Sequence, residues 1–478
     1  MPFKDIYFSE FLPDRGGFPF PKDPGYLVEA KNVRPTTGGY RPMAIDEVVT
    51  NGATLGATPI SAAGFAVVTT AKHFVGSATA LYESDDIGVT WYDNSRGGYT
   101  TTGWWDFDLF GDYVIAVNGV DAPQYKLITD AVSTNFDDLP GNPPVASLVC
   151  RVREHVVLGG LTSNYYAIQF GKIGDPETWP TPGGASALAN QAGLRDMPHE
   201  LGIITQLVGG EKFGLIFQVS GISRMTYVGG NVVWQIDTFE RARGSGFRNS
   251  AKMVNGWCYF ANALGFFRTD GHQVENLSEG RIQDAIVRDF LSLTEATSAF
   301  GWSVAYDSRT STVMWSTSSS YVLCYHIPYE RFSLIYTAST PSLSTLYAVR
   351  NNASTEGALE IPYAFNSTPK LVSFTDQTSV PVALRTGYFE LVEGWAEITG
   401  LEPIGAGSSL ALACKSIAAL SSADLSPSTY TSAASPVRSH RYGIRQSGRY
   451  HSLKVTDTSG ADDLYAGVRV YYEPASEL

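Results

Sequence analysis

The sequence has few charges, few cysteines and no long apolar run. Charged residues make up 17% of its 478 positions and hydrophobic residues 44%, a composition typical of a packed protein and not of a disordered one. The cysteines are too far apart for a metal-ligand motif or a disulfide framework: Cys150, Cys258, Cys324 and Cys414. No apolar stretch reaches the ~20 residues of a membrane helix, so we expect no stable membrane insertion.

Catalytic motifs are also missing. The sequence contains no zinc-binding His-Glu-x-x-His, no Gly-x-Ser-x-Gly elbow, no Walker loop and no Gly-x-Gly-x-x-Gly. Its seven histidines are dispersed: His73, His155, His199, His272, His326, His440 and His451. Because these motifs are missing and the histidines are dispersed, we expect no catalytic residues, no cofactor-binding residues and no metal ligands, and predict that the protein is not an enzyme. The first five residues also lack the apolar core of a secretion signal.

One octapeptide, residues 84–91, carries a recognisable local structure. Ser84, Asp86, Gly88, Thr90 and Trp91 match all five fixed positions of the Asp-box, Ser-x-Asp-x-Gly-x-Thr-Trp. The serine and aspartate oxygens accept hydrogen bonds from turn N–H groups, the glycine takes a positive φ, and the tryptophan packs under the turn. This pattern resembles the turn between outer strands of many β-propeller blades. The alternative is a chance Asp-Gly hairpin in another β fold.

A loose repeat supports the propeller. Short apolar strands followed by polar turns recur at intervals of 42–57 residues, starting at Gly64, Asp112, Glu154, Glu211, Asn255 and Thr310. Four-stranded blades need roughly 40–50 residues each. A stretch at residues 346–349 adds a seventh blade or closes the ring. At 478 residues the chain is also too long for one compact core, because single cores stop growing near roughly 250–300 residues.

The chain divides into three parts by composition, and we predict an all-β fold. Residues 1–45, rich in proline and aromatic residues, form an extended N-terminal arm along their own domain or a neighbouring subunit. Residues 46–382 form a β-propeller-like hub, and residues 383–478 form a small β-sandwich-like domain. A helix capped by Ser278 and reaching Leu291 interrupts the hub. Residues 181–193 form a long surface loop, where a functional insertion is most expected.

Two clusters of basic residues remain. One flanks residues 244–246 and the other lines the C-terminal segment: Arg241, Arg243, Arg248 and Lys252, then Arg438, Arg441, Arg445, Arg449 and Lys454. They indicate either transient contact with DNA or an acidic partner, or outward-facing residues and ion-pair partners at a subunit interface. We favour the interface, because a net charge of −13 opposes a tight, static grip on nucleic acid.

Five segments together resemble the tail nozzle (tail hub) proteins of short-tailed bacteriophages, also called packaged-DNA stabilisation proteins. They are residues 32–42, 173–180, 221–229, 264–271 and 438–455, and they follow one another in the order that the family shows. The resemblance implies a propeller-like hub, six copies in a ring below the portal and its adaptor, and a conduit for genome retention and ejection. It also implies tail fibres or spikes, a possible channel plug and a location in the virion tail after synthesis in the host cytoplasm.

The charge fits this role. Six copies would carry about −78, six times −13, and an acidic lumen would repel the phosphates of passing double-stranded DNA. A rival interpretation is a propeller that binds or hydrolyses glycans, as sialidases do, and the Asp-box is its only support. That enzyme class needs an Arg-Ile-Pro signature, an arginine triad and a Tyr–Glu pair, and no Arg-Ile-Pro occurs here.

Overall fold

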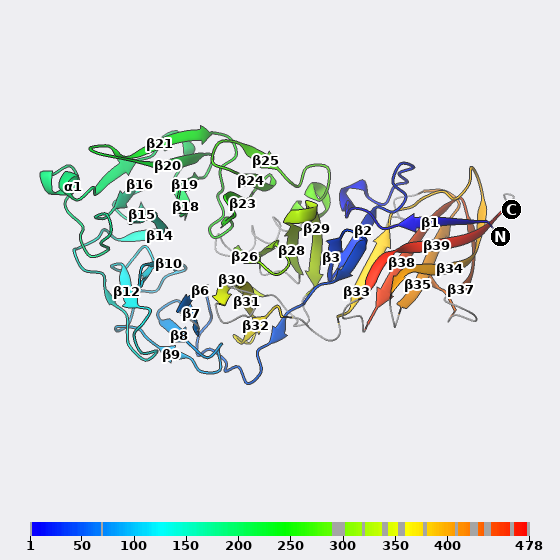
Figure 1. Cartoon of the computed structure of the whole chain (residues 1–478), viewed down its shortest axis with the longest axis horizontal. Helices are drawn as coiled ribbons and strands as arrows, with labels where there is room; N and C mark the ends of the chain where they lie inside the picture. Colours follow the sequence, from blue (N-terminus) through cyan, green and yellow to red (C-terminus); the bar gives the residue numbers. More distant parts are fainter. Residues whose placement is uncertain are drawn as a thin grey trace.

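The structure, a computed structural model, consists of a ring of β-sheets joined at one side to a β-sandwich (Figure 1). It describes residues 2–67, 70–288, 302–317, 321–336, 343–351, 359–375, 380–406, 410–420, 429–434, 441–458 and 463–475. The fold is all-β, as predicted, and the ring is a propeller of seven four-stranded blades. No helix in the described ranges is long and apolar enough to cross a membrane.

Five blades are continuous in sequence. Their strands are β6–β9 (Ser61–Val67, Thr70–Gly76, Leu81–Ser84, Tyr92–Asp93), β10–β13 (Asp106–Phe110, Tyr113–Val117, Gln124–Leu127, Asp137–Asp138), β14–β17 (Ala146–Val152, His155–Leu161, Asn164–Phe170, Gly193–Asp196), β18–β21 (Ile204–Val208, Phe213–Gln218, Ile222–Gly229, Val233–Glu240) and β22–β25 (Lys252–Val254, Trp257–Asn262, Gly265–Thr269, Val274–Asn276).

The last two blades each borrow from the N-terminal segment. Blade six is β26–β29 (Ser303–Asp307, Thr312–Ser316, Tyr321–His326, Arg331–Tyr336), and β2 (Leu27–Lys31) continues its sheet. Blade seven is β30–β32 (Ser344–Asn351, Leu359–Phe365, Leu371–Ser373), and β5 (Glu47–Val48) is its fourth strand. The N-terminal segment therefore takes part in closing the ring.

The innermost strands surround the axis of the propeller. Most contact their neighbours directly, and β30 of blade seven contacts β6 of blade one. Blades four and five are joined by the side chain of Gln206, which donates to Ala251 O at 3.2 Å and accepts from Ser250 N at 3.3 Å. Interior strands such as β15 and β19 are buried at every position because blades stack on both of their faces.

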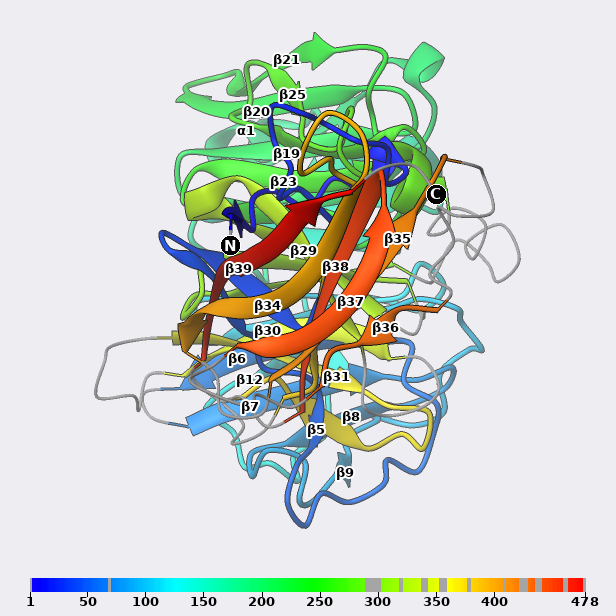
Figure 2. The same ribbon diagram turned by 90° about the vertical axis from the view of Figure 1, so that its right-hand side faces the viewer.

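The sandwich is built from both ends of the chain. One sheet contains β3 (Val33–Thr36), β4 (Gly39–Pro42), β39 (Leu464–Pro474), β34 (Ala396–Ala406) and β37 (Tyr442–Gly448), with β1 (Phe3–Tyr7) on β39. The other continues from blade six through β2 into β33 (Val382–Thr386), β38 (Tyr450–Asp457), β35 (Leu410–Ile417) and β36 (Thr431–Ser432). Figure 2 shows β39, β34 and β37 at the end remote from the propeller.

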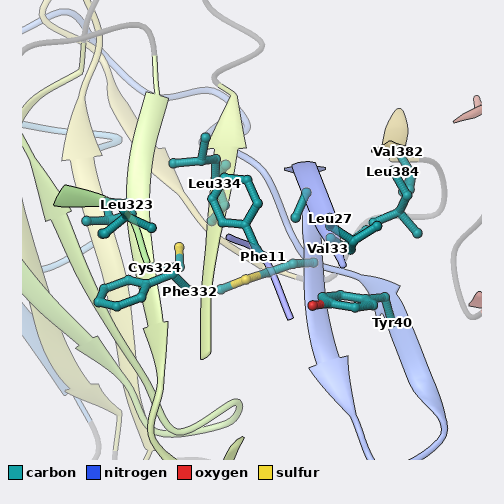
Figure 3. Packing of buried hydrophobic residues seen from close by; sticks show 14 of the residues in the cluster. Phe11, Leu27, Val33, Tyr40, Leu323, Cys324, Phe332, Leu334, Val382 and Leu384 are labelled. Carbon is teal, nitrogen blue, oxygen red and sulfur yellow. The ribbon is translucent and has the colours of Figure 1, made fainter. Parts of the chain in front are cut away.

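The predicted N-terminal arm thus lies within the sheets of the chain itself. Its apolar residues Phe11, Leu27, Val33 and Tyr40 pack with Phe332 and Leu334 of blade six, and with Val382 and Leu384 of the sandwich (Figure 3). All belong to one hydrophobic cluster. Apolar burial contributes roughly 25 cal/mol per Å², so this shared core holds the sandwich against blade six. The domain boundaries at residues 45 and 382 stay a prediction.

Short helical segments lie between the strands. They are η1 (Pro13–Arg15), α1 (Ala185–Ala189), η2 (His199–Leu201), the π-helical turn η3 (Gln283–Val287) and η4 (Ile327–Tyr329). The predicted loop at residues 181–193 therefore contains a helical turn, α1. The prediction that Ser278 caps a helix is wrong, because its hydroxyl accepts the N–H of Phe266 at 3.1 Å and not an N–H of the helical turn.

The N–H groups at the start of η3 are bound by another residue. Asp14 Oδ1 accepts the N–H groups of Asp284 and Ala285 at 2.9 and 2.8 Å. The cap therefore comes from the N-terminal segment, which sequence spacing could not indicate. Residues 289–300, where the predicted helix was to end at Leu291, lie outside the described ranges.

Candidate functional site

The propeller axis is lined by polar and charged residues. Two adjoining cavities, of about 420 and 210 Å³, lie against the innermost strands. They share Asp106 and Asp108 of β10 on one side and Lys252 of β22 on the other. The lysine Nζ lies 4.0 Å from Glu360 Oε2. The two cavities therefore form a polar hollow at the axis of the ring.

The two aspartates join blade two to blade three. Asp106 Oδ2 accepts the N–H of Val149 at 2.9 Å, and Asp108 Oδ2 accepts the N–H of Arg151 at 2.5 Å. Because residues two apart on a strand share a face, both carboxylates reach the same neighbouring strand, β14. The side chains thus bind main-chain donors that would otherwise face the seam between blades unpaired.

Burial disfavours charge on both carboxylates. It raises the pKa of Asp106 to about 7, against the lowering effect of the Val149 N–H and of Arg248. It also raises the pKa of Asp108, against the effect of the Arg151 and Leu109 N–H groups and of the nearby cations. Each side chain keeps some contact with the axial cavity and is half-buried. Asp106 is therefore an axial carboxylate placed to change charge near neutral pH.

Arg248 lies beside this pair. Its guanidinium carbon is 5.6 Å from the ring centre of Trp104, which lines the smaller cavity. Trp104 is buried and donates its indole N–H to Ser147 O at 3.1 Å. Burial lowers the pKa of Arg248, and the Asp106 carboxylate acts in the opposite direction. The arginine therefore interacts within the chain, between an aromatic face and a carboxyl group.

The Asp-box forms the turn between β8 and β9, the two outer strands of blade one. Ser84 Oγ accepts the N–H of Gly88 at 2.9 Å and donates to Asp86 Oδ1 at 2.8 Å, and that oxygen also accepts the N–H of Thr90 at 2.9 Å. Gly88 has φ +75°. Desolvation opposes these hydrogen bonds, but the pKa of Asp86 is lowered overall. The box residues Ser84 and Asp86 thus bind the main chain of their own turn.

The turn also touches blade seven. The ring of Trp91 lies 5.6 Å from that of Phe365, centre to centre, and Gly88 approaches the side chain of Leu371. The carbonyl of Gly88 accepts the N–H of Ala53, which follows the closing strand β5. This turn therefore braces the junction where the first blade meets the last.

Each arginine of the first basic cluster has an acidic or aromatic partner within the chain. Arg241 pairs with Glu200 at 3.2 Å, and Arg243 with Glu240 at 2.8 Å. Arg243 also donates to Val274 O of the next blade at 3.2 Å. The structure therefore spreads this cluster over the blade-four edge and the axis, and does not form one basic patch.

The second cluster lies on the sandwich. Arg445 pairs with Glu397 at 3.4 Å, and Arg449 with Glu390 at 2.9 Å. The guanidinium of Arg441 lies 4.1 Å from the ring centre of Tyr471. Arg438 lies outside the described residues. Exposed pairs of this kind contribute roughly 0–1 kcal/mol each, but they neutralise the cations that a phosphate backbone would need.

Sequence reasoning missed the axial aspartates. Asp106 and Asp108 alternate with Phe107 and Leu109, a pattern that reads as a strand with one solvent-exposed face. Two carboxylates on the innermost strand of a blade would have indicated an axial site. The sequence alone does not show which strand of a blade is innermost, so this signal could be used only after the blades were known. Within the described ranges, no group of three or more His, Cys, Asp or Glu residues is placed to hold a metal ion.

Comparison with known proteins gives no family. No family model matches the chain, and no curated protein matches it. Solved structures do match, among them one titled "YCF48 bound to D1 peptide", with a TM-score of 0.43 and 11% sequence identity. That match covers 70% of this chain and 97% of the other. The propeller assignment rests on the seven blades themselves.

Proposed function

We propose that the chain is a structural subunit of the tail nozzle of a short-tailed bacteriophage. The observation that carries the proposal is the ordered set of five segments that resemble that family. In this chain they contribute β3 and β4 (residues 32–42), the turn before α1 (173–180), β20 (221–229), β24 (264–271), and β37 and β38 (438–455). They therefore draw on both the propeller and the sandwich.

A conduit for the genome would have to form between subunits. The axial cavities of a single propeller hold about 420 and 210 Å³. Both are too small for duplex DNA, because its major groove alone is ~12 Å wide. Hydrogen bonds such as those of Asp106 and Asp108 hold the blades together around this axis. In the proposal the lumen belongs to a ring of copies, six if the resemblance holds, and the propeller axis is not the channel.

The net charge of the chain favours a lumen through which DNA passes over one that holds DNA by binding its phosphates. The chain carries −13, and the described arginines of both basic clusters interact with acidic or aromatic side chains of the same chain. A lumen built from such subunits repels phosphate, so that DNA slides along it. The proposed partners are other copies of the chain, the portal–adaptor ring, fibres or spikes, and a channel plug. The proposed location is the virion tail.

Size analysis tests the proposal. Light scattering of the purified chain, alone and mixed with a portal–adaptor complex, is expected to show a ring or a joint complex of about six copies. Labelling of virions with an antibody against the chain is expected to mark the tail end. A lasting monomer that ignores the portal–adaptor complex and binds or cleaves sialylated glycans would instead favour the glycan-directed propeller.

A further inference from the structure

The outer strands of the blades differ in length and in how they are covered. Those of blades one, two, three, five and seven have two to four residues: β9, β13, β17, β25 and β5. The outer strand of blade six, β29, has six residues, but β2 lies beside it, with Lys31 opposite Leu334. Blade four ends in β21, which has eight residues and no strand beyond it among the described residues.

A long uncovered edge strand is unusual because it offers unpaired N–H and C=O groups to any other chain. Within the described ranges, the main-chain hydrogen bonds of residues 235–239 go to β20 alone. Of the other six blades, five end in a strand of two to four residues, and the sixth ends in β29, which β2 partly covers. The edge of β21 is therefore the place in this propeller where one more strand fits best.

A pocket adjoins the beginning of this strand. It has a volume of about 460 Å³ and lies between the α1 segment, the outer strand of blade three and the tip of the β20–β21 hairpin. Phe170, Leu188, Leu194 and Val233 line it, and Leu188 is 47% exposed. Arg195 ties the two blades together here by donating to Val232 O at 2.8 Å. Val228 and Val232 at the hairpin tip are also exposed.

An acidic side chain lies on the edge strand, opposite Arg224 of β20. Asp237, in the middle of β21, is exposed, and its carboxylate accepts a hydrogen bond from the Gln235 amide at 2.8 Å. The guanidinium of Arg224 does not pair with this carboxylate: it bonds His272 and lies 4.4 Å from the ring centre of Phe213. Opposite charges on facing residues of neighbouring strands attract each other, so a strand with lysine or arginine opposite Asp237 is favoured.

We propose that β21 and the adjoining pocket bind an extended segment of another polypeptide by strand addition. The segment extends the blade-four sheet by main-chain hydrogen bonds, places one apolar side chain in the pocket, and carries a basic side chain opposite Asp237. Main-chain bonding gives affinity in this mode of recognition, and the pocket and the charge give selectivity. The chain itself makes a short contact of this kind, in which Lys31 of β2 lies opposite Leu334 of β29 and the Asn32 N–H donates to Leu334 O at 2.7 Å. The inference does not depend on the nozzle proposal.

The test uses a capped heptapeptide that alternates valine and lysine, with a fluorescent label. The full chain is expected to bind it, and hydrogen exchange is expected to slow at the amides of residues 235–239. The matched peptide has the same side chains but methylated nitrogens at alternate positions, so that it cannot donate the edge hydrogen bonds. Its affinity is expected to be at least about tenfold lower.

Two charge reversals complete the design. Asp237→Lys is expected to weaken binding several-fold, whereas Asp137→Lys, an exposed aspartate on the two-residue outer strand β13, leaves it unchanged. The proposal is overturned by no binding, by equal affinity for the methylated peptide, by protection away from β21, or by an equal effect of both reversals. Self-association of the free chain that protects residues 235–239 would also overturn it, because a second copy would then be the occupant.

Discussion

Tyr347 and His73 form a hydrogen bond that closes the propeller. The phenol oxygen lies 2.8 Å from His73 Nδ1, and both side chains are buried. His73 belongs to β7 in blade one and Tyr347 to β30 in blade seven, and Tyr363 packs edge-on against the same imidazole at 4.9 Å between ring centres. Residues 274 positions apart are thereby joined in the core of the junction.

Loss of this bond should weaken the whole ring. Tyr347→Phe is expected to lower the free energy of unfolding by about 1–3 kcal/mol, because His73 Nδ1 is left buried without its partner. Urea denaturation followed by tryptophan fluorescence measures the change. Tyr329→Phe is the control, since Tyr329 is 39% exposed. An equal, small effect of both substitutions would show that the junction does not depend on the bond.

Acidification should destabilise the fold through buried histidines. Burial lowers the pKa of His73 to about 4, of His326 to about 3 and of His451 to about 4. The unfolded chain binds these protons below about pH 6.5 and the folded chain does not, so their contribution to stability is lost as the pH falls below that value. We expect His326→Gln to flatten the pH dependence of the unfolding free energy between pH 6 and 4, because unfolding then takes up at most one proton fewer. An unchanged slope would contradict the assignment.

Asp106 should act in the opposite direction. Because its pKa is raised to about 7, its contribution to stability is complete below about pH 4 and is lost as the pH rises through 7. We expect Asp106→Asn to gain stability relative to the unmodified chain, by at least about 1 kcal/mol, between pH 4 and 8. Thermal unfolding of the two proteins across this range gives the difference. A difference independent of pH would mean that Asp106 is ionised throughout.

A buried carboxylate should hold blades one and two together. Glu83 binds Lys72 at 2.8 Å and also pairs with Lys126, and all three side chains are less than a tenth exposed. Glu83→Gln would leave two ammonium groups buried without a counter-ion, which we expect to cost about 3–5 kcal/mol of unfolding free energy. Glu211→Gln removes the acid of the exposed Arg151–Glu211 pair and should change it by less than about 0.5 kcal/mol. Equal losses would exclude a special role for Glu83.

Local patterns were predictable from the sequence, and pairings distant along the chain were not. The Asp-box could be located because Ser84 and Gly88 act within one turn. Repeat starts such as Asp112, Glu154 and Asn255 lie at or just before the second strands of their blades. Turns such as Asn255-Gly256, both at positive φ, mark these hairpins by composition alone.

The positions of β2 and β5 depend on partner strands more than 300 residues away, and residues 27–31 and 47–48 carry no sequence pattern that indicates which strands these are. The same holds for Asp14, which replaces Ser278 at the start of η3. The alternation of polar and apolar residues at 106–109 predicts that Asp106 and Asp108 face solvent. The same alternation occurs when the polar side chains face a neighbouring blade, so the sequence pattern does not separate the two cases. Sequence pattern therefore predicts blades, and their closure requires the structure.

Electron microscopy of the purified chain with its portal–adaptor complex tests the central proposal most directly. We predict a ring of six copies, each of 51.7 kDa, whose shared lumen lies outside the individual propeller axes. A monomer at micromolar concentration, absent from the tail end of intact virions, would contradict the nozzle assignment.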